Sequence, residues 1–229
     1  MKALTLAFQD DPRFAELKKH RDEVGGIHHV WGMDRRITPL LMEALSDTKR
    51  FRLIVTYEER RAREIVEDYR FYSRQTFYYP AKDALFYSAD IHSNNTVQER
   101  LEIFKKIAEG RPCTVVTTIE GLMDKIPSIS HIIENILTIK VGDTLQLDTF
   151  SRKLTTLGYE KTSIVETPGQ FSVRGGIIDI FSLTEECPYR VELWGDDIDS
   201  IRSFDVESQR SMERVEEFVI YPSTEMVLD

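Results

Sequence analysis

The order of apolar and polar positions changes character partway along the chain. Between residues 27 and 118, short apolar runs alternate with segments whose apolar residues recur every three or four positions. The first pattern is typical of buried strands and the second of amphipathic helices. Because strands and helices alternate, we expect a parallel sheet with helices on its faces. The predicted strands are Ile27–Trp31, Phe51–Tyr57, Thr76–Tyr79 and Cys113–Thr118.

Helix signals lie between these strands. Asp11-Pro12 has the N-cap and first-turn proline of a helix start. Thr96 and Glu99 have the spacing of a capping box and predict the start of a helix that ends at Gly110. The other two predicted helices follow Pro39 and Tyr57.

The alternation ends at Pro127-Ser128, which predicts a boundary between domains of residues 1–127 and 128–222, with residues 223–229 as a tail. After it we expect a strand at Thr138–Val141, a helix capped by Asp148, and then strands only. The predicted fold is α/β: a parallel-sheet domain followed by a smaller α+β domain with an antiparallel sheet.

The stretch from Pro168 to Asp205 predicts three strands in series. Gly175-Gly176 interrupts the first strand and predicts a bulge or a close backbone approach. The second strand is Tyr189–Trp194, in which apolar and polar residues alternate. Arg190 and Trp194 are four residues apart and therefore share a strand face.

We expect Arg174 to lie on the same outer surface as Arg190 and Trp194. An exposed Trp beside two Arg is typical of a protein-binding hot spot. The alternative is structural, with Trp194 packed under a loop and each Arg paired with a nearby acid. From the residues alone the structural alternative is favoured.

Composition and charge narrow the possible partners. The 229 residues are 41% hydrophobic and 30% charged, which is typical of a folded globular protein. No apolar run approaches the roughly 18 residues of a membrane span, and no signal peptide is recognisable. Cys113 and Cys187 occur in unrelated contexts, so we expect free thiols in the cytoplasm. Residues 127–229 contain 9 Lys/Arg and 19 Asp/Glu, a balance of −10, which favours a protein partner over DNA.

A phosphate-binding loop would be expected between the first predicted strand and the following helix, at Gly32–Pro39. The motif G-x-x-x-x-G-K-[ST] requires Gly, Lys and a hydroxyl at positions that here hold Ile37, Thr38 and Pro39. Arg35 and Arg36 could attract an anion only weakly. The His residues lack Cys partners at metal-ligand spacing. We therefore expect no cofactor, no metal and no catalytic residue.

Two runs carry a specific resemblance: PGQFSVRGGIIDIF, and PYRVELWGDDIDSIRSFDVESQRS. They resemble the N-terminal, UvrB-like module of the bacterial transcription-repair coupling factor family (Mfd). The similarity extends upstream through IKVGDTLQLDTFSRKLTTLGYE and covers about residues 27–222.

The resemblance implies a helicase-lobe-like first domain with a degenerate P-loop, and a second domain that binds UvrA through Arg174, Arg190 and Trp194. The family usually has Phe where this chain has Trp194. It also implies that the last strand, Phe218–Tyr221, returns to the first domain. We expect the three side chains to be exposed, so that replacing either Arg barely changes folding.

The function implied is a non-catalytic recruitment module that binds UvrA in transcription-coupled nucleotide excision repair. The full-length protein would be an ATP-dependent DNA translocase, with RNA polymerase, duplex DNA and its own C-terminal domain as further partners. The same surface could instead, or in addition, be autoinhibitory. The alternative function is a UvrB-like ATP-dependent DNA damage-recognition subunit, which would need the Lys that Thr38 replaces and a longer aromatic hairpin than residues 78–95 provide.

Overall fold

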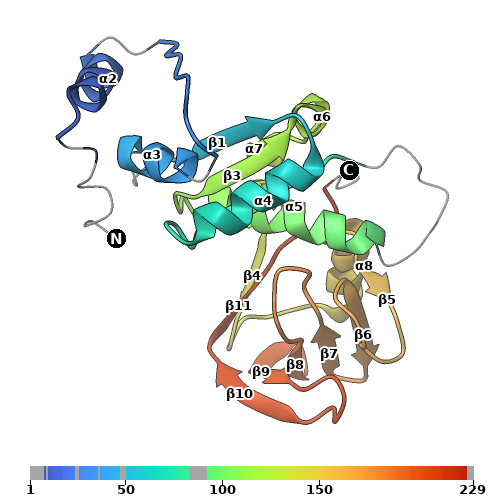
Figure 1. Cartoon of the computed structure of the whole chain (residues 1–229). Coiled ribbons are helices and arrows are strands. Elements are labelled where there is room, and N and C mark those ends of the chain that lie inside the picture. Colours follow the sequence, from blue (N-terminus) through green and yellow to red (C-terminus); the bar gives the residue numbers. More distant parts are fainter. Residues whose placement is uncertain are drawn as a thin grey trace. The chain divides into compact units, whose positions relative to one another are not determined.

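The structure is a computed structural model, and it describes residues 8, 10–23, 26–35, 37–46, 50–82 and 92–225. The chain forms two compact units, which are treated separately below (Figure 1). The first contains Met1–Leu85 and Gly110–Asp124, and the second contains Phe86–Glu109 and Lys125–Asp229. The boundary at residue 127 stays a prediction. Residues 83–91, in the segment expected to be too short for an aromatic hairpin, and 226–229 of the predicted tail lie outside the described residues.

The first unit contains a three-stranded parallel sheet in the order β1-β3-β2. Helix α4 packs on it through Ala62 and Val66, which contact Tyr78 and Val116. The predicted parallel sheet is therefore confirmed, while the likeness to a helicase lobe stays a prediction. The elements are α2 (Pro12–Glu23), α3 (Thr38–Leu45), β1 (Arg52–Thr56), α4 (Glu59–Arg70), β2 (Thr76–Tyr79), β3 (Thr114–Thr118) and α6 (Ile119–Met123).

One predicted strand of this unit is wrong. Ile27–Trp31 has no regular secondary structure, and the side chains of Ile27 and Trp31 are exposed. A β-propensity pattern becomes a strand only where a neighbouring strand and a face to bury are available. The described residues 26–35 therefore do not supply the strand that precedes a phosphate-binding loop.

The second unit is built on a six-stranded sheet in the order β10-β9-β8-β7-β6-β5. Its neighbours are antiparallel except β5 and β6, which are parallel. The predicted antiparallel sheet is thus confirmed, with one parallel edge strand. The strands are β5 (Glu160–Lys161), β6 (Gln170–Arg174), β7 (Ile177–Ile180), β8 (Tyr189–Trp194), β9 (Asp197–Phe204) and β10 (Ser211–Val215).

The same unit contains helices α5 (His92–Ala108), α7 (Ile129–Glu134) and α8 (Leu147–Thr156), and the strands β4 (Leu137–Lys140) and β11 (Glu217–Ile220). Helix α5 begins before Thr96, so the Thr96–Glu99 pair lies inside the helix. The prediction that Thr96 caps the helix is therefore wrong. The same Thr–Glu spacing also occurs inside a helix, where residues three apart are neighbours on its surface, so the spacing alone does not mark a helix start. Asp148 lies in the first turn of α8 rather than at its N-cap, where its charge still favours the helix dipole.

The last strand does not return to the first unit. Residues Glu217–Ile220 of β11 pair antiparallel with Lys140–Leu137 of β4. Both strands belong to the second unit, so the predicted crossing is wrong. The apolar residues Phe218 and Ile220 alternate with exposed or half-buried ones and complete this unit's own core, which explains the pairing.

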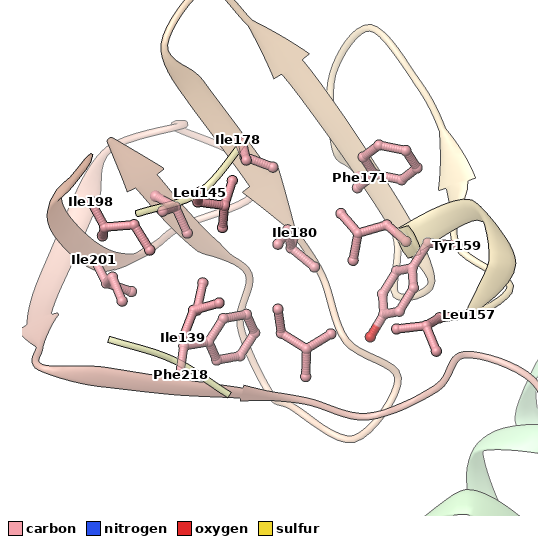
Figure 2. Packing of buried hydrophobic residues seen from close by; sticks show 13 residues of the cluster. Ile139, Leu145, Leu157, Tyr159, Phe171, Ile178, Ile180, Ile198, Ile201 and Phe218 are labelled. Carbon is pink, nitrogen blue, oxygen red and sulfur yellow. The ribbon is translucent and has the colours of Figure 1, made fainter. Parts of the chain in front are cut away.

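The core of the second unit lies on one face of the six-stranded sheet (Figure 2). Helix α8 contributes Leu154 and adjoining Leu157, and the β4–β11 pair contributes Ile139 and Phe218. The sheet contributes Phe171, Ile178, Ile180, Val191, Ile198 and Ile201, and an irregularity in the pairing of β8 with β9 keeps Ile198 and Ile201 on one face although they are three residues apart. Because successive residues of a strand point to opposite faces, the residues between these occupy the other face of the sheet, here called the outer face.

We expect Phe171→Ala to lower the free energy of unfolding by about 3–5 kcal/mol, since Phe171 is fully buried in this core. Urea denaturation followed by circular dichroism measures the loss. Ile164→Ala, at an exposed position, is the control and should stay within about 0.5 kcal/mol of the parent protein. Equal effects of the two substitutions would contradict the assignment of the core.

Candidate functional site

Gly175 and Gly176 connect β6 to β7. Arg174 pairs with Ile177 across these two glycines, so the predicted bulge is instead a two-residue hairpin turn. Gly175 has a φ of 59°, a value that suits glycine in such a turn. A Cβ on Gly176 would lie 3.0 Å from the backbone oxygen of Leu193, so the predicted close backbone approach is found there. The turn places Arg174 at the end of β6, on the outer face.

Asp179 of β7 joins the two candidate arginines. Its side chain is completely buried. Nε of Arg190 donates to Oδ1 of Asp179 at 2.7 Å, and Nη2 donates to Oδ2 at 2.9 Å. Nη2 of Arg174 donates to Oδ2 at 2.5 Å. One buried carboxylate therefore accepts a bidentate pair of hydrogen bonds from Arg190 and a third hydrogen bond from Arg174.

Arg190 is held on its other sides too. Its guanidinium carbon lies 4.6 Å from the ring centroid of Phe204, and Nη1 donates to the backbone oxygen of Gln209 at 3.3 Å. The hydrogen bonds to Asp179 raise the pKa of Arg190. Only 15% of its side chain is exposed, so the expectation of an exposed Arg190 is wrong.

Arg174 is more exposed than Arg190 and keeps hydrogen-bond donors available for a further acceptor. Its side chain is 44% exposed, and its one recorded partner in the described part of the chain is Asp179, bound through Nη2. Nε and Nη1 of Arg174 therefore donate no hydrogen bond to any described residue. Arg174 can hold a further acceptor while Asp179 keeps its guanidinium in place.

Trp194 ends β8 and is 85% exposed. The structural alternative, in which it packs under a loop, is therefore wrong for this residue, whereas the pairing of each Arg with an acid is correct. Trp194 is four residues from Arg190 on one strand, so the two share the outer face. The structure thus brings Arg174, Arg190 and Trp194 to one face of the sheet.

The sequence did not single out Asp179. The available signal was an acid within the apolar run Ile177–Phe181 of a buried strand. A carboxylate at such a position needs a cationic partner to offset its desolvation. The partners lie on the two neighbouring strands, and the pairing of β7 with β6 and with β8 is what identifies them as Arg174 and Arg190.

The Gly32–Pro39 segment has a different geometry from a phosphate loop. Ile37 is the helical N-cap of α3 and makes no side-chain cap, and Pro39 lies in the first turn without a backbone N–H. The hydroxyl of Thr38 donates to the backbone oxygen of Asp34. Arg36 lies outside the described residues. The described part contains no cluster of three His, Cys, Asp or Glu side chains that could hold a metal.

We expect Arg190→Ala to lower the free energy of unfolding by about 2 kcal/mol or more, because it leaves a buried carboxylate with one partner. Arg202→Ala removes a partly exposed arginine of the same sheet and should cost about 0.5 kcal/mol or less. Chemical denaturation of both variants measures this. The added change Asp179→Ala should recover part of the loss, and no recovery would argue against the buried ion pair.

We also expect Mg-ATP to bind more weakly than a Kd of about 100 μM, or roughly −5.5 kcal/mol, since the loop lacks its Lys and its hydroxyl. Isothermal titration calorimetry measures the affinity. Tighter binding would contradict the interpretation of Ile37, Thr38 and Pro39 as a degenerate loop.

No helix in the described ranges is both long and apolar enough to cross a membrane.

The chain is similar to known proteins, both in its second half and along its whole length. Residues 137–226 match the family model of the UvrB interaction domain. The whole chain is 30% identical over 230 residues to the transcription-repair-coupling factor of Staphylococcus aureus (strain bovine RF122 / ET3-1), of which it covers 20%. It is 29% identical over 214 residues, 90% of the chain, to the transcription-repair-coupling factor of Bacillus subtilis (strain 168), of which it covers 18%.

The chain thus spans about a fifth of the length of these curated relatives. The resemblance found in the sequence is confirmed: residues 137–226 match the UvrB interaction domain, and the chain is similar along its whole length to the transcription-repair-coupling factors.

Proposed function

We propose that this chain is a non-catalytic recruitment module that binds UvrA during transcription-coupled nucleotide excision repair. The observation that carries the proposal is Trp194, a large aromatic side chain that is 85% exposed beside two arginines held by one buried carboxylate. Exposing an indole to water is unfavourable, whereas Trp and Arg are the residue types most enriched in binding hot spots. The match to the UvrB interaction domain supports a protein partner of this repair system.

The three side chains have different parts in the proposed contact. Trp194 is the apolar anchor, because it loses most water-exposed area on docking. Arg174 binds a carboxylate or carbonyl of UvrA through the donors that Asp179 leaves available. Arg190 contributes mainly by fixing Asp179, and through it Arg174, because little of its own guanidinium is exposed.

The proposal assigns no chemistry to this chain. RNA polymerase, duplex DNA and the C-terminal domain of a longer protein stay predicted partners, as do autoinhibition through the same surface and a cytoplasmic location. ATP-driven translocation would belong to other parts of the longer protein. The UvrB-like enzyme is the weaker alternative, since Thr38 replaces the Lys that it would need.

We expect Trp194→Ala to weaken binding to UvrA of the same organism by about 2 kcal/mol or more, which corresponds to a Kd about 30-fold higher. Calorimetry or size-exclusion co-elution measures the affinity. The melting temperature of the Trp194→Ala variant should equal that of the parent chain, because the exposed indole is not part of the hydrophobic core.

Trp31→Ala is the matched control, since Trp31 is the chain's other tryptophan and is 84% exposed in the first unit. It should leave the affinity for UvrA unchanged. Equal affinities of the two variants would move the contact away from Trp194, and no binding by the unmodified chain would contradict the proposed function itself.

A further inference from the structure

A row of arginines crosses the outer face of the six-stranded sheet. Arg190 of β8 is directly opposite Arg202 of β9, and Arg202 is directly opposite Arg214 of β10. On the other side, Arg190 is opposite Asp179 of β7. Directly paired residues of neighbouring strands point to the same face. Asp179, Arg190, Arg202 and Arg214 therefore form one continuous line, here called the arginine row.

The row is poorly compensated at its β10 end. Asp179 neutralises Arg190. Among the described residues, the one ion-pair partner of Arg202 is Glu192, whose Oε2 lies 3.9 Å from Nη2 and already accepts a hydrogen bond from Ser200. Arg214 is exposed, and no ion pair or hydrogen bond of its side chain is recorded within the described ranges. Like charges directly opposite each other destabilise a sheet. The three arginines of the row thus face one carboxylate of the row, an excess of two positive charges.

This concentration contrasts with the rest of the second half of the sequence. Residues 127–229 contain 9 Lys/Arg and 19 Asp/Glu. Four of these nine basic residues, Arg174, Arg190, Arg202 and Arg214, lie on the outer face of a single sheet. Repulsion among these arginines lowers the stability of the free protein. A binding partner that supplies negative charge would remove this repulsion, which would explain why the arginines are gathered there.

We propose that Arg202 and Arg214 extend the surface around Arg174 and Trp194 across β9 and β10, and that this extension binds an acidic patch of the partner protein. The inference rests on the proposed function and adds the chemistry of the partner. Neighbouring strands lie about 4.8 Å apart, so the backbones of Arg202 and Arg214 are separated by about 5 Å. The row therefore fits a patch with at least two carboxylates at that separation.

A protein patch fits better than a nucleic acid. Glu192 lies between the arginines of this face, and two further acids, Asp196 of the turn and Asp197 at the start of β9, follow Trp194 after Gly195. A phosphate backbone is a continuous line of negative charge and would be repelled by these carboxylates. A protein partner can place acidic side chains opposite the arginines and basic or neutral ones opposite the carboxylates. The mixed charges of this face would then contribute to specificity.

The test replaces both extension residues, as Arg202→Gln with Arg214→Gln, in the full chain. The control is Arg152→Gln with Lys161→Gln, which removes two positive charges from exposed positions of the same unit outside the row. UvrA affinity should fall about tenfold or more in the row variant and less than about twofold in the control. The row variant should also show a weaker dependence of the affinity on salt. Melting temperatures check that both variants are folded.

A hexaglutamate peptide serves as a probe that does not depend on UvrA. NMR titration should shift amide signals of β8, β9 and β10 in the parent chain and in the control, but not in the row variant. Suppose that UvrA binds the parent chain and that Trp194→Ala weakens this binding. If the row variant then binds UvrA as tightly as the parent chain, the extension is wrong while the proposed function holds. If the chain does not bind UvrA, the proposed function fails, and absence of hexaglutamate binding then overturns the row as well. Duplex DNA binding that is tighter than hexaglutamate binding and is lost in the row variant would overturn the assignment to a protein.

Discussion

The outer face of the second unit depends on a carboxylate that has no access to water. Asp179 is fully buried, and a buried charge is tolerated only when opposite charges and hydrogen bonds offset its lost hydration. Arg190 and Arg174 meet that need from the strands on either side of β7. The ion pairs therefore couple three neighbouring strands, and they orient two guanidinium groups on a surface where long side chains would otherwise move freely.

This constraint separates two kinds of residue on one sheet. The inner face follows ordinary alternation and packs against α8 and the β4–β11 pair, so it accounts for most of the stability of the second unit. The outer face has only a small apolar cluster around Phe204, and Arg190 lies over that ring. Beyond this cluster the face is mostly charged or polar, with Ile177 between Arg174 and Glu192 and one exposed indole at its edge. Because the inner face stabilises the sheet, the outer face can hold exposed aromatic and charged side chains that are unfavourable in the free protein. Such side chains on a rigid sheet are suited to recognition of a partner.

The sequence predicted what depends on local pattern. The apolar run at Cys113–Thr118 and the strict alternation at Tyr189–Trp194 indicated their strands correctly, and the four-residue spacing of Arg190 and Trp194 was enough to place them on one face. Ile27–Trp31 was wrongly predicted as a strand, and the last strand was predicted correctly but assigned to the wrong unit, because the pattern of a segment does not identify the strand it pairs with.

The site itself was only half predictable for the same reason. The residue pattern singled out the arginines and the tryptophan, and the family resemblance added their expected role in binding UvrA. Asp179 and the arginine row needed the pairing of β7 with β8, of β8 with β9 and of β9 with β10. The exposure of each side chain also depended on distant residues: Gln209 and Phe204 bury Arg190, whereas nothing in the described ranges covers Trp194.

In the proposed complex, Trp194 becomes buried against UvrA. The chain has two tryptophans, so Trp31→Phe leaves Trp194 as its only indole. Its fluorescence should be measured with and without saturating UvrA whose own tryptophans have been replaced by Phe, together with quenching by acrylamide. We expect the emission to shift to shorter wavelength and the indole to be strongly protected from acrylamide in the complex. An indole that stays as accessible to acrylamide in the saturated complex as in the free chain would contradict this burial.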